Sequence, residues 1–220
     1  MMNKIILIPK NLLLHLILFM HLASCNNNND GAASKPAAEP KPAAVASYYL
    51  PVPPGWTTER ISFPIEFAPG INYKGTEDLR FAKGWDNVNS EEHWCYAFAW
   101  WLDGKPQINE IILQKNLTEY YSGLVGLNVM EKKIPANKVV PTVATITLVP
   151  SMKGDNTTYT GRISMLDYHS ENAIILNCMI HVKDCDTKEH TGILVEISPR
   201  PFDHAVWKQL NALNTNFSCD

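Results

Sequence analysis

The residues best suited to chemistry lie in one short stretch that combines indole, imidazole and carboxylate side chains. Trp85, Asp86, Glu92 and His93 are close together in the sequence. An imidazole beside carboxylates could act as a general acid or base in a hydrolase or isomerase. Neither a serine-nucleophile motif (GxSxG or SxxK) nor a glycine-rich phosphate loop occurs in the chain. The stretch therefore predicts a cryptic site, and it assigns no catalytic residue.

The histidines lack the spacing of metal ligands. Past residue 24, no two of them stand at helical ligand spacing, and the motifs HExxH and CxxC are missing. We therefore predict no metal site and no cofactor, and we expect surface or hydrogen-bonded histidines. The five in this part of the chain are His93, His169, His181, His190 and His204.

Tryptophan is concentrated in one region. Five of the six tryptophans are Trp56, Trp85, Trp94, Trp100 and Trp101. An indole combines a large apolar ring with one N–H donor, so these rings could fill a core or form an exposed surface for a protein or a glycan. The bulky core is the simpler interpretation, and the exposed surface is the alternative.

Arg80 is the one cation between large apolar residues in this region, Leu79 and Phe81. It could pair with Glu77 or Glu92 in a structural bridge, or it could hold an anionic ligand, and we favour the bridge. The candidate ligand or interface residues are Arg80, Trp85, Asp86, Glu92, His93, Trp100 and Trp101.

These residues are organised around the apolar stretch 94–102, which predicts a β-strand. Its large side chains (Trp94, Tyr96, Phe98, Trp100 and Leu102) alternate with Cys95, Ala97, Ala99 and Trp101. Neither face is polar, so we expect a central strand that is covered on both sides. The small face leaves room for a closely packed helix, and we expect the helix over 108–127 to lie there.

The remaining elements follow from apolar periodicity and turn residues. We expect strands over 59–67 and 78–83 before the central strand, a helix over 108–127, strands over 139–149, 158–168, 174–182 and 193–197, and a helix from the cap Asp203 to 214. The short turns between the last four strands predict an antiparallel meander. The fold class is α+β, with a largely antiparallel sheet of about seven strands and two helices packed on it.

The N-terminus predicts export and a lipid anchor. Residues 1–24 combine an early positive charge with a short apolar core, as in a signal peptide. Leu22-Ala23-Ser24-Cys25 resembles the lipobox of bacterial lipoproteins, which implies acylation (such as palmitate) on Cys25. Residues 25–47 are rich in Asn, Ala, Pro and Lys, so we expect a disordered tether to a single domain over 48–220.

Four cysteines remain after the anchor, and an exported protein could oxidise them. Cys178 shares an apolar strand face and Cys95 lies in the central strand, so both are expected to be buried. Cys185 and Cys219 follow a strand and the last helix, and they are the candidate disulfide pair. Spacing alone leaves the other pairings open.

Two resemblances extend this interpretation. The strings FAP, GxExLRFAxGW and WxYxFxWWLxG between residues 67 and 104 resemble a family of exported bacterial lipoproteins with no assigned activity. The element order is also similar to Mog1/PsbP-like domains, which implies a binding or assembly module rather than an enzyme.

We therefore expect a domain that is lipid-anchored in the bacterial cell envelope, at the periplasmic face or the cell surface. We expect it to bind an envelope protein or a glycan without catalysis. A hydrolase or isomerase with a site near Trp85, Asp86, Glu92 and His93, and a structural envelope component, are the alternatives. The formal net charge of −3 and the lack of a basic run argue against nucleic acid.

Overall fold

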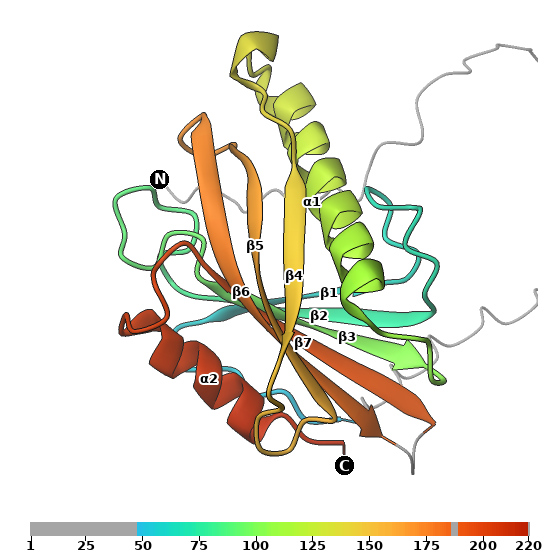
Figure 1. The fold of residues 1–220 in the computed structure, drawn as a ribbon. Helices are drawn as coiled ribbons and strands as arrows, with labels where there is room; N and C mark the ends of the chain where they lie inside the picture. The colour runs from blue at the N-terminus through green and yellow to red at the C-terminus, as the bar shows by residue number, and fades with distance from the viewer. Residues whose placement is uncertain (1–47, 186–188, 220) are drawn as a thin grey trace, which may run out of the picture. The chain divides into compact units, whose positions relative to one another are not determined.

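The computed structural model describes residues 48–185 and 189–219. The predicted signal peptide, the lipidation site Cys25 and the tether lie outside the described residues. The strands are β1 (Thr57–Ser62), β2 (Gly75–Phe81), β3 (Tyr96–Asp103), β4 (Val143–Val149), β5 (Thr157–Asp167), β6 (Asn172–Cys185) and β7 (His190–Ser198). The helices are α1 (Glu110–Lys132) and α2 (Val206–Asn216), with a short 3-10 turn, η1 (Ala136–Lys138), after α1 (Figure 1).

The seven strands of the described part form one antiparallel sheet in the order β1-β2-β3-β7-β6-β5-β4. The first three strands form a meander, and α1 then carries the chain to the far edge of the sheet. The last four strands return as the predicted meander and pair β7 with β3. The structure confirms the α+β fold class, the seven-stranded antiparallel sheet and the two helices.

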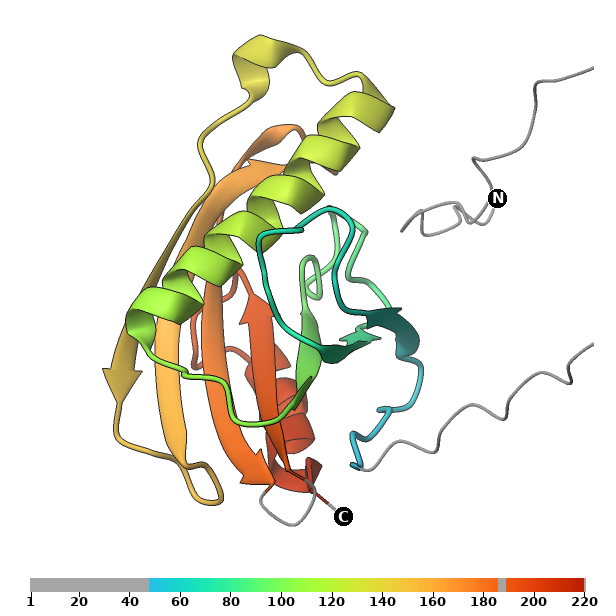
Figure 2. The ribbon, with the colours of Figure 1, turned by 90° about the vertical axis from the view of Figure 1, so that its right-hand side faces the viewer.

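Helix α1 crosses the face of the sheet that carries the bulky side chains of β3 (Figure 2). The rings of Phe98 and Tyr120 stack with their centroids 5.3 Å apart, and the hydroxyls of Tyr96 and Tyr121 are hydrogen-bonded. The prediction that this helix packs against the small face of β3 is therefore wrong. Aromatic rings on both elements fill the interface, and such pairs contribute about 0.5–1.5 kcal/mol each beyond their burial.

An extended segment and α2 cover the opposite face, where β3 carries its small side chains. Arg80 donates from Nε to the carbonyl of Pro51 and from Nη2 to that of Leu50, both at 3.0 Å. The Tyr48 ring stacks on Trp101 with a centroid distance of 4.6 Å. The small face of β3 therefore makes room for residues 48–51 and the Arg80 side chain rather than for α1.

Strand β1 is shorter than predicted. It ends at Ser62, directly before the cis peptide bond between Phe63 and Pro64, and residues 63–74 form a loop instead of a longer strand. The loop packs on α1 at Gly123, where an added Cβ would lie 1.7 Å from the carbonyl oxygen of Phe67. Only glycine permits this close approach.

The helix bounds also differ from the predicted ones. Asn109 caps α1 by accepting a hydrogen bond from the backbone N–H of Ile112 at 2.9 Å, and the helix continues to Lys132 rather than ending near residue 127. Asp203 does not cap α2, which begins at Val206 without a side-chain cap. None of the helices in the described ranges is long and apolar enough to cross a membrane.

The sheet has two ends with different surroundings. At the loop end lie the 82–95 connection, the β5–β6 turn and the 199–205 connection, as the pairing of Tyr96 with Ile197 requires. At the tether end, Tyr49 forms a β-bridge with Ser218, next to the C-terminus of α2. The chain therefore enters the described domain at the tether end and begins β1 at the loop end.

A disulfide at the tether end joins Cys185 to Cys219, with their Cα atoms 5.5 Å apart. These two cysteines are the candidate pair predicted from their positions in the sequence. Cys95 and Cys178 are free and buried in the sheet.

Candidate functional site

One carboxylate at the loop end joins two loops. Asp167, the last residue of β5, accepts hydrogen bonds from His93 Nε2 at 3.0 Å, Trp94 Nε1 at 3.0 Å, the His169 backbone N–H at 2.8 Å and the Ser170 hydroxyl at 2.5 Å. Two donors come from the 82–95 connection and two from the β5–β6 turn. Both loops are therefore fixed relative to each other.

Burial and hydrogen bonding set the charges in this cluster. Burial alone would raise the pKa of Asp167, but the hydrogen bonds to its carboxylate, first that from His93, hold the pKa well below its usual range. Burial, together with the nearby ammonium of Lys132, lowers the pKa of His169 to about 4. At neutral pH the cluster therefore contains a carboxylate and a neutral imidazole at His169.

Aromatic rings enclose His169. Its ring centroid lies 5.4 Å from those of Trp85 and Trp94, 4.6 Å from that of Tyr168 and 5.7 Å from that of His93. Three buried polar atoms here make no hydrogen bond within the protein, namely Trp85 Nε1, His93 Nδ1 and His169 Nε2. Buried polar atoms usually have partners, so three such atoms in one cluster mark a candidate site.

The arrangement has part of the geometry of acid–base catalysis. Since the ionised Asp167 can only accept, His93 donates through Nε2, and in a neutral imidazole Nδ1 would then carry the lone pair. The Ser170 hydroxyl, however, donates to Asp167 and not to an imidazole. The contacts therefore provide an oriented base without a serine activated by it.

The structure places three of the predicted site residues, Trp85, His93 and Asp86, near His169, and the remaining ones elsewhere. Trp85 and His93 both contact His169 through their rings. The carboxylate of Asp86 lies close enough to raise the pKa of His169 slightly, against the larger lowering by burial. Glu92 instead has a local role, because its Oε2 accepts a hydrogen bond from the backbone N–H of Gly84 at 2.9 Å.

The predicted interface tryptophans of β3 are not on the surface. Trp100 is 0% exposed, and its Nε1 donates to Glu77 Oε1 at 3.1 Å. Trp101 is 5% exposed and lies between Tyr48 and the His190 ring. These side chains build the core, so neither presents a ring to a partner in this structure.

Arg80 forms a buried structural bridge, but with Asp78. The Arg80 guanidinium donates to Asp78 Oδ1 at 2.5 Å and to Oδ2 at 3.1 Å. Glu77, the partner expected from the sequence, points to the opposite face of β2, and Glu92 is bonded elsewhere. Residues two apart on a strand share a face, which explains why the charge at position 78 is the partner.

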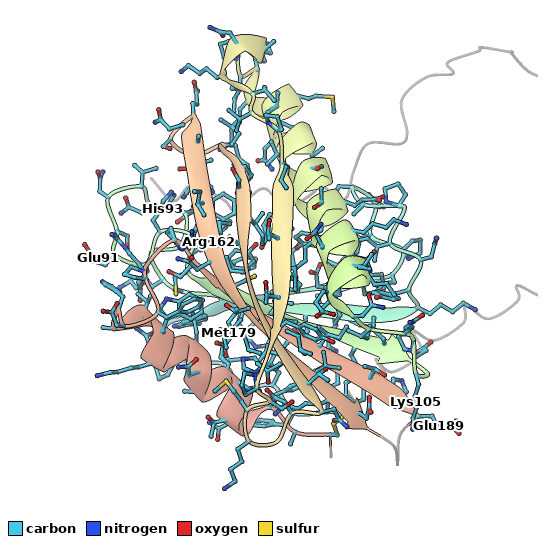
Figure 3. All side chains as sticks on the ribbon, viewed as in Figure 1. Glu91, His93, Lys105, Arg162, Met179 and Glu189 are labelled. Atoms are coloured by element: carbon cyan, nitrogen blue, oxygen red, sulfur yellow. A yellow bond between two sulfur atoms is a disulfide. The ribbon has the colours of Figure 1, made fainter. Side chains whose placement is uncertain are left out.

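Exposed and half-buried side chains of the 82–95 and 199–205 connections lie at the same end of the sheet, and we call them the loop surface (Val88, Glu91, Arg200, Phe202 and His204). Glu91 Oε2 lies 3.3 Å from Arg200 Nη2 and 3.2 Å from His204 Nε2. Arg200 also donates to the carbonyl oxygen of Glu91 at 3.2 Å. Val88 and Phe202 are 46% and 47% exposed. Figure 3 shows Glu91 and His93 on the same connection.

A second group of buried charges lies under α2, and no motif in the sequence predicts it. His181 Nδ1 lies 2.7 Å from Asp155 Oδ2, and His181 Nε2 lies 3.6 Å from Glu196 Oε1. The ammonium of Lys183 lies 3.8 Å from Asp155 Oδ1. The side chains of His181, Asp155 and Glu196 are all 0% exposed.

The carboxylates keep His181 charged. Burial would lower the pKa of His181, but hydrogen bonding and charge from Asp155 and Glu196 raise it to about 9. Burial raises the pKa of Glu196 and lowers that of Lys183. The group ties the β4–β5 turn to β6 and β7. His181 and Lys183 alternate with apolar residues, which is the signal that could have shown a polar face on β6.

Within residues 48–185 and 189–219, no three histidine, cysteine, aspartate or glutamate side chains are grouped so that they could hold a metal ion. Comparisons of the chain with protein-family models, curated proteins and solved structures found no match.

Proposed function

We propose that this protein is lipid-anchored in the bacterial cell envelope and that its exported domain binds a partner without catalysis. The anchor is supported by the lipobox-like sequence at Cys25 and the Pro-rich tether that follows it. The binding role is supported by one structural observation, the position of the loop surface on connections that hydrogen bonds hold together.

The loop surface lies at the end of the sheet away from the point where the tether joins the domain. Asp167 holds the 82–95 connection to the β5–β6 turn, and Arg200 holds it to the 199–205 connection. Loops that a rigid scaffold positions are the usual place for recognition. Val88 and Phe202 are exposed on the same two connections as the paired Glu91 and Arg200, and a mixture of apolar and charged side chains suits a protein partner.

The test uses a photo-crosslinking amino acid at Val88 in the membrane-anchored protein. We expect one discrete crosslinked product in envelope membranes, and we expect Arg200→Glu to remove it. The matched control carries the same group at Ile111, which is 80% exposed at the start of α1 near the tether end. No product at Val88, or the same products at both positions, would refute the proposal.

The alternative is an envelope hydrolase or isomerase that uses His93. The unpartnered Nδ1 of His93, oriented by Asp167, favours it. A screen of ester, amide and glycoside substrates should show activity that His93→Ala removes and His204→Ala keeps. If the wild-type chain is inactive in such a screen while Val88 gives a crosslink, the binding role stands alone.

A further inference from the structure

Strand β4 forms one edge of the sheet, next to α1 (Figure 1). It pairs with β5 on one side, and among the described residues no strand pairs with it on the other. Such an edge can accept a further strand, and natural edges are usually protected from this by charged side chains or proline. Residues 143–149 (VATITLV) contain neither, whereas the opposite edge strand, β1, contains Glu59 and Arg60.

Two contacts show which residues of β4 direct their backbone groups away from the sheet. The backbone N–H of Ala144 donates to Thr118 Oγ1 of α1 at 3.0 Å, so it is not directed at β5. The carbonyl oxygen of Thr145 does point toward β5, because a Cβ added at Gly161 would lie 2.4 Å from it. The direction of the backbone groups alternates along a strand. The outward groups therefore belong to the even-numbered residues of β4.

The part of this edge that is open to a partner consists of Ile146 and Leu148, and we call these two residues the free edge. Before them, the N–H of Ala144 is already bonded to the Thr118 hydroxyl. After them, Pro150 has no N–H to donate. The free edge therefore offers two N–H donors and their carbonyl oxygens, between two positions that cannot donate to a partner.

A second copy of β4 matches the free edge when the strands are antiparallel and the two-fold axis passes through Thr147. Ile146 of each chain then lies opposite Leu148 of the other, and each of the two pairs exchanges both of its N–H···O=C bonds. In the same register, Ala144 lies opposite Pro150, so the two positions that cannot donate to a partner meet each other. The pairing therefore leaves no backbone donor of this edge without an acceptor.

The side chains match in the same register. Leu148 is 50% exposed in the single chain, and the pairing places it beside Ile146 of the second copy. The two Thr147 side chains face each other across the axis, and such cross-strand threonine pairs are favourable. No like charges meet, because residues 143–149 carry no charged side chain. An unrelated strand would have to supply this match by its own sequence, whereas a second copy supplies it by symmetry.

We propose that β4 pairs with β4 of a second copy of this chain around Thr147, so that the two seven-stranded sheets become continuous. The interface is separate from the loop surface, which lies on the 82–95 and 199–205 connections.

The test is cysteine crosslinking of the full chain in freshly broken cells, with copper phenanthroline as the oxidant. In Thr147→Cys the two thiols face each other across the axis with their Cα atoms about 4.5 Å apart, which is within disulfide range. We expect a product of twice the chain mass that a reductant dissociates, and none from the wild type. The matched control is Thr145→Cys, which is exposed on the same face. Its two cysteines would lie roughly 13 Å apart along the paired strands, so it should give no dimer.

Two further comparisons make the test independent of a single substitution. Thr145→Cys combined with Val149→Cys in one chain should restore the dimer, because these two positions lie opposite each other in the proposed register. Leu148→Lys, added to Thr147→Cys, puts a charge into the pairing and should lower the crosslinked fraction about tenfold. Ile175→Lys, at a β6 position that is 53% exposed, should leave that fraction unchanged.

The urea midpoint of each variant shows whether it still folds. If neither Thr147→Cys nor the double-cysteine variant gives a dimer in a folded protein, the proposal is wrong. Equal dimer yields from Thr147→Cys and Thr145→Cys would indicate random collision and would also overturn it. A crosslinked product of another mass would assign the edge to a different protein instead of a second copy. Because other residues form the loop surface, failure here leaves the crosslinking result at Val88 unaffected.

Discussion

A buried glutamate between the sheet and α1 makes the stability of this domain depend on pH. Glu77 is 0% exposed, its Oε1 accepts a hydrogen bond from Trp100 Nε1 at 3.1 Å, and its Oε2 has no partner. Burial raises the pKa of Glu77 to about 8, against the opposing effects of Trp100 and of the Tyr120 hydroxyl. Glu77→Gln keeps the size and the acceptor oxygen of the side chain but cannot ionise.

Proton linkage gives the direction and the size of the pH dependence that Glu77 adds to the free energy of unfolding. Because the folded pKa of Glu77 is above the unfolded value, its contribution to stability is fully present below the unfolded pKa. It is lost as the pH rises through about 8. The slope is about 1.4 kcal/mol per pH unit between those two values. From pH 5 to pH 8 the wild type should therefore lose roughly 3–4 kcal/mol through this one group.

The assay is urea unfolding at several pH values from 5 to 9, on the chain from residue 25 with Cys25→Ala and with or without Glu77→Gln. Subtracting the two curves removes the pH dependence of all other groups, Glu196 included. Glu66→Gln, at an exposed position, is the matched control and should follow the wild type. If the wild type and Glu77→Gln show parallel pH profiles, Glu77 is ionised at little cost and the burial argument fails.

Three further results are expected. Cys25→Ala should abolish lipid labelling and membrane association, and persistence in membranes after a carbonate wash would contradict the lipobox. Phe98→Ala removes a ring that stacks on α1 and should destabilise the domain by ~3–5 kcal/mol in urea, against ~1–3 kcal/mol for Ala99→Leu; a midpoint for Phe98→Ala near wild type would contradict the core assignment. Asp167→Asn replaces an acceptor of four hydrogen bonds and should cost about 1–3 kcal/mol, read as a lower urea midpoint. An unchanged midpoint would show that the two loops are held by other contacts.

Apolar periodicity was sufficient to predict the element order of the described domain. Alternation in β3 and the period of α1 are strong signals because each reflects a buried face. The same alternation could not say which face of β3 meets α1. That choice depends on the path of the chain from one sheet edge to the other and on the match of Phe98 with Tyr120, neither of which is a property of a single strand.

Only part of the candidate site at the loop end could be predicted from the sequence. Trp85 and His93 stand near each other along the chain, so a local search finds them. Asp167 and His169 lie more than seventy residues further on, and their place beside His93 depends on how the β5–β6 turn reaches the 82–95 connection. A histidine and a carboxylate that lie this far apart in the sequence form no short motif, so a motif search cannot detect the pair.

The charges under α2 show a more general reason why contacts between side chains could not be predicted from the sequence. In β6, His181 and Lys183 alternate with Ile180 and Val182, a pattern typical of a strand with one side in water. In the folded chain α2 and the C-terminal residues cover this end of β6, so the polar side is buried as well. Burying these charges is tolerable because the strand register places Glu196 of β7 on the same face as His181, while the β4–β5 turn supplies Asp155. A polar strand face in the sequence therefore predicts where charged side chains lie. Whether they are exposed to solvent or form buried ion pairs depends on the strand register and on the elements that cover the face.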